Sequence, residues 1–150
     1  MDVAVLRRDQ AKLQSCFSGW SLHKTGNGVL EPWPTNERLE LPIHQVHAER
    51  DNVQLEFLLN EVSDETWLFR RNPKISMPLE RMSRLSSEGI PYLCPEIVLL
   101  YKAKAPRDYD TEDFERARTL LDADARQWLA TALAECHPGH EWTRKLELPK

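Results

Sequence analysis

Two carboxylates stand at apolar runs in the first half of the sequence, and their chemistry is the first to consider. Asp2 precedes the apolar run 3–6, and Glu56 lies inside the run 53–59. Both runs predict β-strands, and alternation along a strand places Glu56 on the face opposite its apolar neighbours. Two strand carboxylates that converge on one point suit Mg²⁺, which prefers hard oxygen ligands. Half-exposed strands also carry charged residues on a solvated face, and that alternative stays open.

Two lysines in the second half of the sequence are candidates for binding phosphate. Lys102 and Lys104 stand near the end of an apolar segment that starts at Pro95 and predicts a helix. Side chains two residues apart on a helix point in different directions, so one of the two is expected to face a bound triphosphate. A solvated surface position is the alternative.

Two further groups have metal-ligating side chains at less suitable spacings. Asp108, Asp110 and Asp113 resemble an acidic metal cluster. We favour the interpretation that they stabilise the positive end of the helix that follows. His44 and His47 are three residues apart on an expected strand, which places them on opposite faces and makes them a poor metal pair.

Eight segments of the chain carry a resemblance to a known family. They are residues 2–10, 19–20, 55–61, 67–71, 89–104, 107–108, 113–114 and 128–129. The most specific part runs from Pro-Tyr-Leu-Cys-Pro-Glu to Lys-Ala-Lys, residues 91–104. In these segments the chain resembles the aminoglycoside and lincosamide adenylyltransferase-like members of the nucleotidyltransferase superfamily, over nearly its whole length.

This resemblance implies a reaction and roles for particular residues. In that family an Asp-x-Asp pair and a third carboxylate hold Mg²⁺, and AMP passes from ATP to a hydroxyl of a small molecule. Asp2 matches the second aspartate, Met1 the variable position, and Glu56 the third carboxylate, which also acts as general base. Lys102 or Lys104 would face the triphosphate. The implied acceptors include aminoglycoside or lincosamide antibiotics, with antibiotic resistance as the biological role.

The sequence departs from the family pattern at its beginning. The family's glycine turn, the helix after it and the first aspartate of the pair are not among the 150 residues. We therefore expect an N-terminally truncated domain without meaningful adenylyl transfer. The alternative function is a non-catalytic remnant that binds a small molecule or a protein. A sheet that lacks an element exposes an edge or an apolar face, so we also expect a homodimer.

Composition and charge indicate which classes of partner and which cellular compartment to expect. The formal net charge is -4, and Lys and Arg form no basic run, which argues against nucleic acid. No apolar run approaches the roughly 20 residues that a membrane span requires, and no signal peptide is recognisable. The three cysteines are widely spaced, which is typical of free thiols in a reducing compartment. These features predict a cytoplasmic protein.

The pattern of expected elements predicts an α+β fold in a single domain, 1–150, that is β-rich over 1–90 and helical over 91–150. We expect a mixed sheet, with strands over 2–6, 20–24, 39–50, 53–62 and 66–71. Helices are expected over 7–18, from residue 95 to between 101 and 105, from 110 or 111 to about 121, over 124–136 and over 141–148. Residues 72–89 are expected to be irregular, with a possible short helix.

Overall fold

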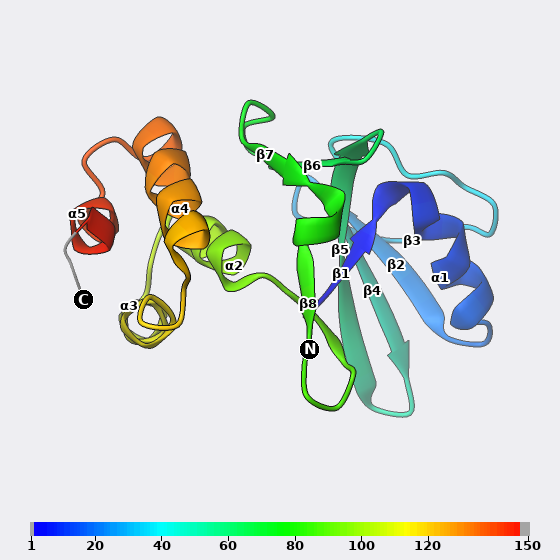
Figure 1. The fold of residues 1–150 in the computed structure, drawn as a ribbon. Coiled ribbons are helices and arrows are strands. Elements are labelled where there is room, and N and C mark those ends of the chain that lie inside the picture. The colour runs from blue at the N-terminus through cyan, green and yellow to red at the C-terminus, as the bar shows by residue number, and fades with distance from the viewer. Residues whose placement is uncertain (1, 148–150) are drawn as a thin grey trace. The chain divides into compact units, whose positions relative to one another are not determined.

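The computed structural model describes residues 2–147, and within them the chain forms two compact units. The first ends at Leu79 and the second starts at Glu80. The fold is α+β with a mixed sheet in the first half and helices toward the end, which confirms the predicted class (Figure 1). The division at Leu79 lies eleven residues before residue 90, where the β-rich part of the sequence is predicted to end.

The first unit is built on a twisted sheet with short helical segments after its first strand. Its elements are β1 (Asp2–Leu6), a 3₁₀ turn (Arg7–Asp9), α1 (Gln10–Cys16), β2 (Ser21–Gly26), β3 (Val29–Pro32), β4 (Gln45–Arg50), β5 (Val53–Ser63), β6 (Thr66–Leu68) and β7 (Ser76–Pro78). The strand order is β3-β2-β4-β5-β6-β7, and β1 pairs with β5 in parallel. The remaining pairs are antiparallel, so the sheet is mixed.

Two tight hairpins set the register of this sheet. Asn27 and Gly28 connect β2 to β3, and Asp51 and Asn52 connect β4 to β5. All four residues have positive φ, between 51° and 77°. This is the backbone of the two-residue turns that match the twist of the flanking strands, and Asn, Asp and Gly tolerate it best. Asn27-Gly28 and Asp51-Asn52 therefore form turns for which their residue types are suited.

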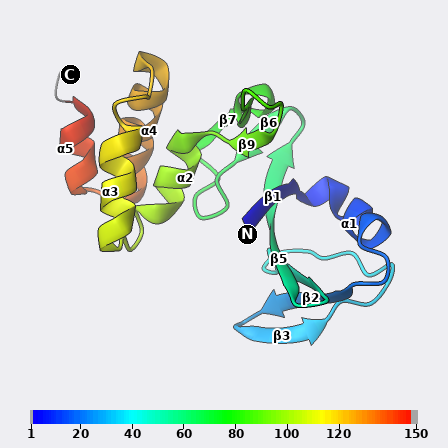
Figure 2. The same ribbon diagram turned by 90° about the horizontal axis from the view of Figure 1, so that it is seen from below.

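One face of the sheet is covered by α1 and carries the core of the first unit (Figure 1 and Figure 2). Leu13 of α1 packs with Val46, Phe57 and Leu59 from the central strands. These strand residues alternate with residues that project to the other face, most of which are polar. We call this other face, formed by alternate residues of β1 to β5, the open face.

The predicted strand over 39–50 is wrong in its first half, because β4 begins only at Gln45. Leu39 is instead a buried residue of a largely exposed loop, and polar side chains bond to its backbone groups. Its N–H donates to Gln10 Oε1 at 2.6 Å, and its carbonyl accepts from Arg7 Nη1 and Gln10 Nε2, both at 3.1 Å. With these groups engaged, and with no N–H at Pro42, the segment has little left for strand pairing.

The second unit carries a two-stranded ribbon and four helices. Its elements are β8 (Ser83–Leu85), β9 (Pro91–Leu93), α2 (Pro95–Lys102), α3 (Asp108–Ala117), α4 (Ala123–Cys136) and α5 (Glu141–Glu147), and a 3₁₀ turn (Leu79–Arg81) spans the boundary. The antiparallel pair β8-β9, together with β7, corrects the prediction that 72–89 is irregular. These strands have three residues each, too few to show a periodic pattern. Leu148, the last residue of the predicted final helix, lies outside the described residues.

Polar residues cap the starts of α3 and α4, and α3 starts earlier than predicted. Asp122 caps α4, as its Oδ1 accepts from the Ala125 N–H at 2.8 Å. The predicted start of α3 at 110 or 111 is late, because α3 begins at Asp108 and Asp110 stands in its first turn. Asp110 accepts the Arg107 N–H at 3.0 Å, as the third residue of a capping box does. No helix within residues 2–147 has the length and apolar character needed to cross a membrane.

Candidate functional site

The two carboxylates singled out in the sequence lie side by side in the sheet. β1 and β5 run parallel, and Asp2 is the register partner of Glu56. Partners in register on neighbouring strands project to the same face. That face is the open one, since Val3 and Phe57, the next residues of the two strands, pack in the core on the other side. Asp2 is exposed, whereas Glu56 is half-buried.

The same row of the sheet continues through two histidines. His47 of β4 is the register partner of Glu56, and His23 of β2 is the partner of His47. Across four neighbouring strands the open face therefore carries His23, His47, Glu56 and Asp2 in line. Sequence reasoning missed this row, because only strand register brings positions so far apart together. His44 lies before β4, and its Nδ1 is 3.0 Å from the Pro42 carbonyl oxygen.

Glu56 is oriented by a neighbour on the adjacent strand. Gln45 Nε2 donates a hydrogen bond to Glu56 Oε1 at 2.5 Å. Gln45 and Glu56 both project to the open face from β4 and β5, two register steps apart. A donor to a carboxylate oxygen restrains its rotation, as residues behind a metal ligand commonly do. Gln45 is thus a further residue of the candidate site that sequence reasoning did not identify.

The open face is acidic. The alternate residues of β1 to β5 that form it include three carboxylates, those of Asp2, Glu49 and Glu56, and no lysine or arginine. Lys24 of β2 lies on the opposite face, where its Nζ is 2.5 Å from Glu37 Oε1. A face with this charge attracts cations and repels a triphosphate that arrives without its metal ion.

The donor set at this place is compatible with Mg²⁺, although it does not form a complete protein cage. Within residues 2–147, no group of three or more His, Cys, Asp or Glu side chains is arranged to hold a metal ion. Mg²⁺ commonly takes one or two carboxylates and completes its octahedron with water and substrate phosphates. Asp2 and Glu56 place two carboxylates in register on this face.

Lys102 and Lys104 belong to the second unit. Lys102 ends α2, and its Nζ lies 2.8 Å from Asp110 Oδ1 and 2.7 Å from Asp113 Oδ2. Burial alone lowers the pKa of Lys102, but the two carboxylates outweigh it and the net pKa is raised. Lys102 is therefore charged and already paired. Lys104 lies beyond the helix and is exposed, without an acidic partner among residues 2–147.

Asp110 is a structural residue within this cluster. It is buried, and the Arg107 and Lys102 side chains that bond to it, in that order, hold its pKa well below the usual range. With both oxygens engaged by cations, Asp110 fits the helix-end role favoured from the sequence. Nothing in its surroundings is arranged as a metal site in the part of the chain that the structure describes.

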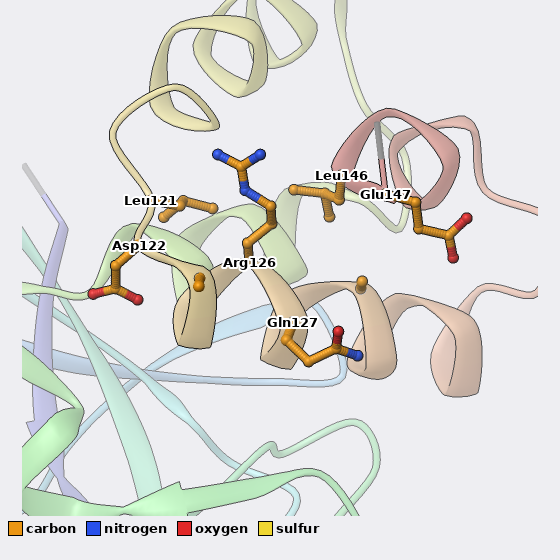
Figure 3. A pocket seen from close by; sticks show the side chains of 8 residues that line it. Leu121, Asp122, Arg126, Gln127, Leu146 and Glu147 are labelled. Atoms are coloured by element: carbon orange, nitrogen blue, oxygen red, sulfur yellow. The ribbon is translucent and has the colours of Figure 1, made fainter. Parts of the chain in front are cut away.

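A surface pocket of about 550 Å³ lies in the second unit, apart from all residues named so far as site candidates (Figure 3). Its lining comes from α4, α5 and the residues before α4, and comprises Leu121, Asp122, Ala123, Arg126, Gln127, Ala130, Leu146 and Glu147. Arg126 Nη2 donates to the Arg118 carbonyl at 3.1 Å, and Asp122 caps α4. Two of the three charged residues in its lining thus already have structural partners, and no nucleophile–base arrangement is present in that lining.

Comparison with known proteins adds no relative. No family model, no curated protein and no solved structure matches the chain.

Proposed function

We propose that this chain is a nucleotidyltransferase-type domain whose parent reaction transfers AMP from ATP to a hydroxyl of a small molecule. The observation that carries this proposal is the in-register pair of Asp2 and Glu56 on neighbouring parallel strands, with both carboxylates on one open face. The resemblance implies metal binding for these same two residues. Two positions so far apart in the sequence have no local reason to meet.

The roles of the residues follow from their positions. Asp2 and Glu56 would hold Mg²⁺, which when bound neutralises phosphate charge and positions the α-phosphate. The acceptor oxygen attacks the α-phosphorus and pyrophosphate leaves. Glu56 is the general base of this proposal and accepts the proton of the attacking hydroxyl. Gln45 keeps its carboxylate oriented through the 2.5 Å hydrogen bond.

The 150 residues provide two of the three carboxylates of the implied site and none of its glycine turn. We therefore propose that the chain as it stands binds Mg²⁺ and ATP weakly and does not transfer AMP at a useful rate. Losing a metal ligand and the backbone donors of the turn removes charge stabilisation and positioning, each typically worth several kcal/mol of barrier.

One observation favours the second candidate function, a non-catalytic binding module. Lys102, a residue expected at the triphosphate, is held by Asp110 and Asp113 and is not available to a phosphate unless these pairs open. Of the two lysines, Lys104 is then the one left to contact a ligand.

Metal titration tests the proposed site without requiring turnover. Mn²⁺ replaces Mg²⁺ at oxygen-ligand sites, so we would measure bound Mn²⁺ by electron paramagnetic resonance, with and without ATP. Asp2→Asn and Glu56→Gln should each weaken binding about tenfold or more, because each removes one of two anionic ligands. Glu49→Gln is the matched control, since Glu49 lies on the same face but outside the pair.

Two outcomes would reject the proposal. One is equal Mn²⁺ binding by the wild type, Asp2→Asn and Glu56→Gln. The other is an equal loss for Glu49→Gln, which would show that the general charge of the face, and not the pair, attracts the ion. Pyrophosphate release by the wild type that Asp2→Asn abolishes would support the site but overturn the inactivity of this chain.

A further inference from the structure

The two histidines of the open face form a pair that the proposed transfer reaction does not use. His23 of β2 and His47 of β4 are register partners in an antiparallel ladder, so their side chains leave the same face side by side. Cα atoms of directly opposed residues in such ladders are about 4.5–5.5 Å apart. An imidazole is long enough at this spacing for two ring nitrogens to reach one ion by side-chain rotation.

Neither ring is engaged by the residues that the structure describes. Among residues 2–147, His23 and His47 make no hydrogen bond through their side chains, no ion pair and no ring contact. By contrast, His44 contacts the Pro42 carbonyl and His140 accepts the Trp142 N–H at 3.1 Å. Both members of the pair are half-buried. Half-buried imidazoles without partners on an open face are free to take an external ligand.

The surroundings favour a cation as that ligand. The alternate residues of β1 to β5 on the open face include no lysine or arginine, and Glu49 and Glu56 flank His47 on this face. An incoming metal ion would meet no competing positive charge there. Carboxylates at these neighbouring positions also attract a divalent ion electrostatically, even where they do not coordinate it.

We propose that His23 and His47 form a two-histidine site for a borderline divalent transition metal ion of the class of Cu²⁺, Ni²⁺ and Zn²⁺. Imidazole nitrogen suits these ions, whereas Mg²⁺ prefers oxygen. The described residues supply no third ligand in a preformed arrangement, so water or a bound molecule completes the coordination. The site does not need Asp2 or Glu56 as a ligand and stands independently of the proposed transfer activity.

Cu²⁺ is the probe that tests this site most directly. Its electron paramagnetic resonance spectrum distinguishes one bound imidazole nitrogen from two. The wild type should show two bound nitrogens, whereas His23→Ala and His47→Ala should each show one. Each variant should also bind Cu²⁺ at least about tenfold more weakly, because removing even a residue behind a metal ligand typically lowers metal affinity about tenfold. His44→Ala is the matched control, because His44 precedes the same strand but is not part of the pair.

A second measurement uses the unchanged protein and so does not depend on how the variants fold. Substoichiometric Cu²⁺ should broaden the imidazole resonances of His23 and His47 together, ahead of those of His44. Unchanged Cu²⁺ affinity and two-nitrogen signal in the double variant His23→Ala/His47→Ala would overturn the proposal, as would broadening that begins at other histidines.

The Cu²⁺ and Mn²⁺ experiments test the two proposed sites independently. Asp2→Asn should abolish much of the Mn²⁺ binding and leave the two-nitrogen Cu²⁺ signal intact, because Asp2 is two strands from His47 in the row. Loss of both signals in Asp2→Asn would show that β1 pairing is disturbed and would reject independent sites.

Discussion

Arg7→Met tests how the loop that precedes β4 is held to the sheet. Arg7 is only 7% exposed in its side chain, and its Nη2 lies 2.6 Å from Glu61 Oε1. Its Nε donates to the same oxygen at 2.7 Å, and its Nη1 donates to the Leu39 carbonyl at 3.1 Å. Methionine keeps the length and apolar character of the stem but removes every donor. Glu61 is then left as a half-buried carboxylate without a partner.

The expected cost follows from the burial of the two partners. Removing one member of a fully buried ion pair typically costs about 3–5 kcal/mol. The Glu61 side chain is 21% exposed, so water recovers part of this loss. We expect the free energy of unfolding of the first unit to fall by about 2–4 kcal/mol. Gln10 still donates to the Leu39 carbonyl, so that group loses only one of two bonds.

A unit-specific probe is needed because the chain has two compact units and need not unfold in one step. Trp67 lies in the first unit, is fully buried, and donates its indole N–H to Asn60 Oδ1 at 3.0 Å. Its indole resonance during urea unfolding therefore reports the first unit alone.

A double-mutant cycle with Glu61→Leu isolates the pair. The variant Arg7→Met/Glu61→Leu should be more stable than the sum of the single losses predicts, by about 1–3 kcal/mol, since neither partner is left unpaired. A cost below about 1 kcal/mol for Arg7→Met, the usual limit for an exposed pair, would refute the reasoning. Strict additivity of the two substitutions would refute it as well.

Two further predictions concern the second unit. Trp142 is fully buried and stacks on Phe114 with ring centroids 4.4 Å apart. Trp142→Ala should therefore lower the free energy of unfolding of the second unit by about 3–5 kcal/mol, measured by urea unfolding followed through α4 amide resonances. A loss under about 1 kcal/mol would contradict this prediction. The pKa of Asp110 is held low, first by the Arg107 side chain, so its stabilising contribution is present above its unfolded pKa of about 3.9 and is lost as pH falls toward the folded value. The stability difference between wild type and Asp110→Asn should therefore be largest near neutral pH and shrink in acid, and a difference that does not change with pH would contradict this.

The parts of the fold that could be predicted from the sequence are those with a local cause. The proline at the start of α2 and the alternation around Glu56 each act within a few residues, and each appears where expected. The loop at Leu39 could not be predicted, because side chains of Arg7 and Gln10 far away in sequence determine its backbone partners. Its apolar residues alone predict a strand.

The candidate site shows the same limit. Asp2 and Glu56 could be named from their apolar neighbours and the family resemblance, but their register could only be hypothesised. Gln45 and the row through His23 and His47 depend on which residues of β2, β4 and β5 face each other. A shift by one residue in either ladder would move these side chains to the opposite face. No short motif encodes that register.

The parallel pairing of β1 with β5 also orders the events of folding. The β2-β3 and β4-β5 hairpins close over two residues each and can form within microseconds, whereas the pairing of β1 with β5 closes a far longer loop at a higher entropic cost. β1 has one pairing partner among residues 2–147, so it is also a strand that can detach while the hairpins persist. The His23–His47 pair depends on the pairing of β2 with β4 and does not involve β1, whereas the Asp2–Glu56 pair exists only while β1 is docked. A ligand bound between these two carboxylates would slow amide hydrogen exchange in β1 far more than in β4.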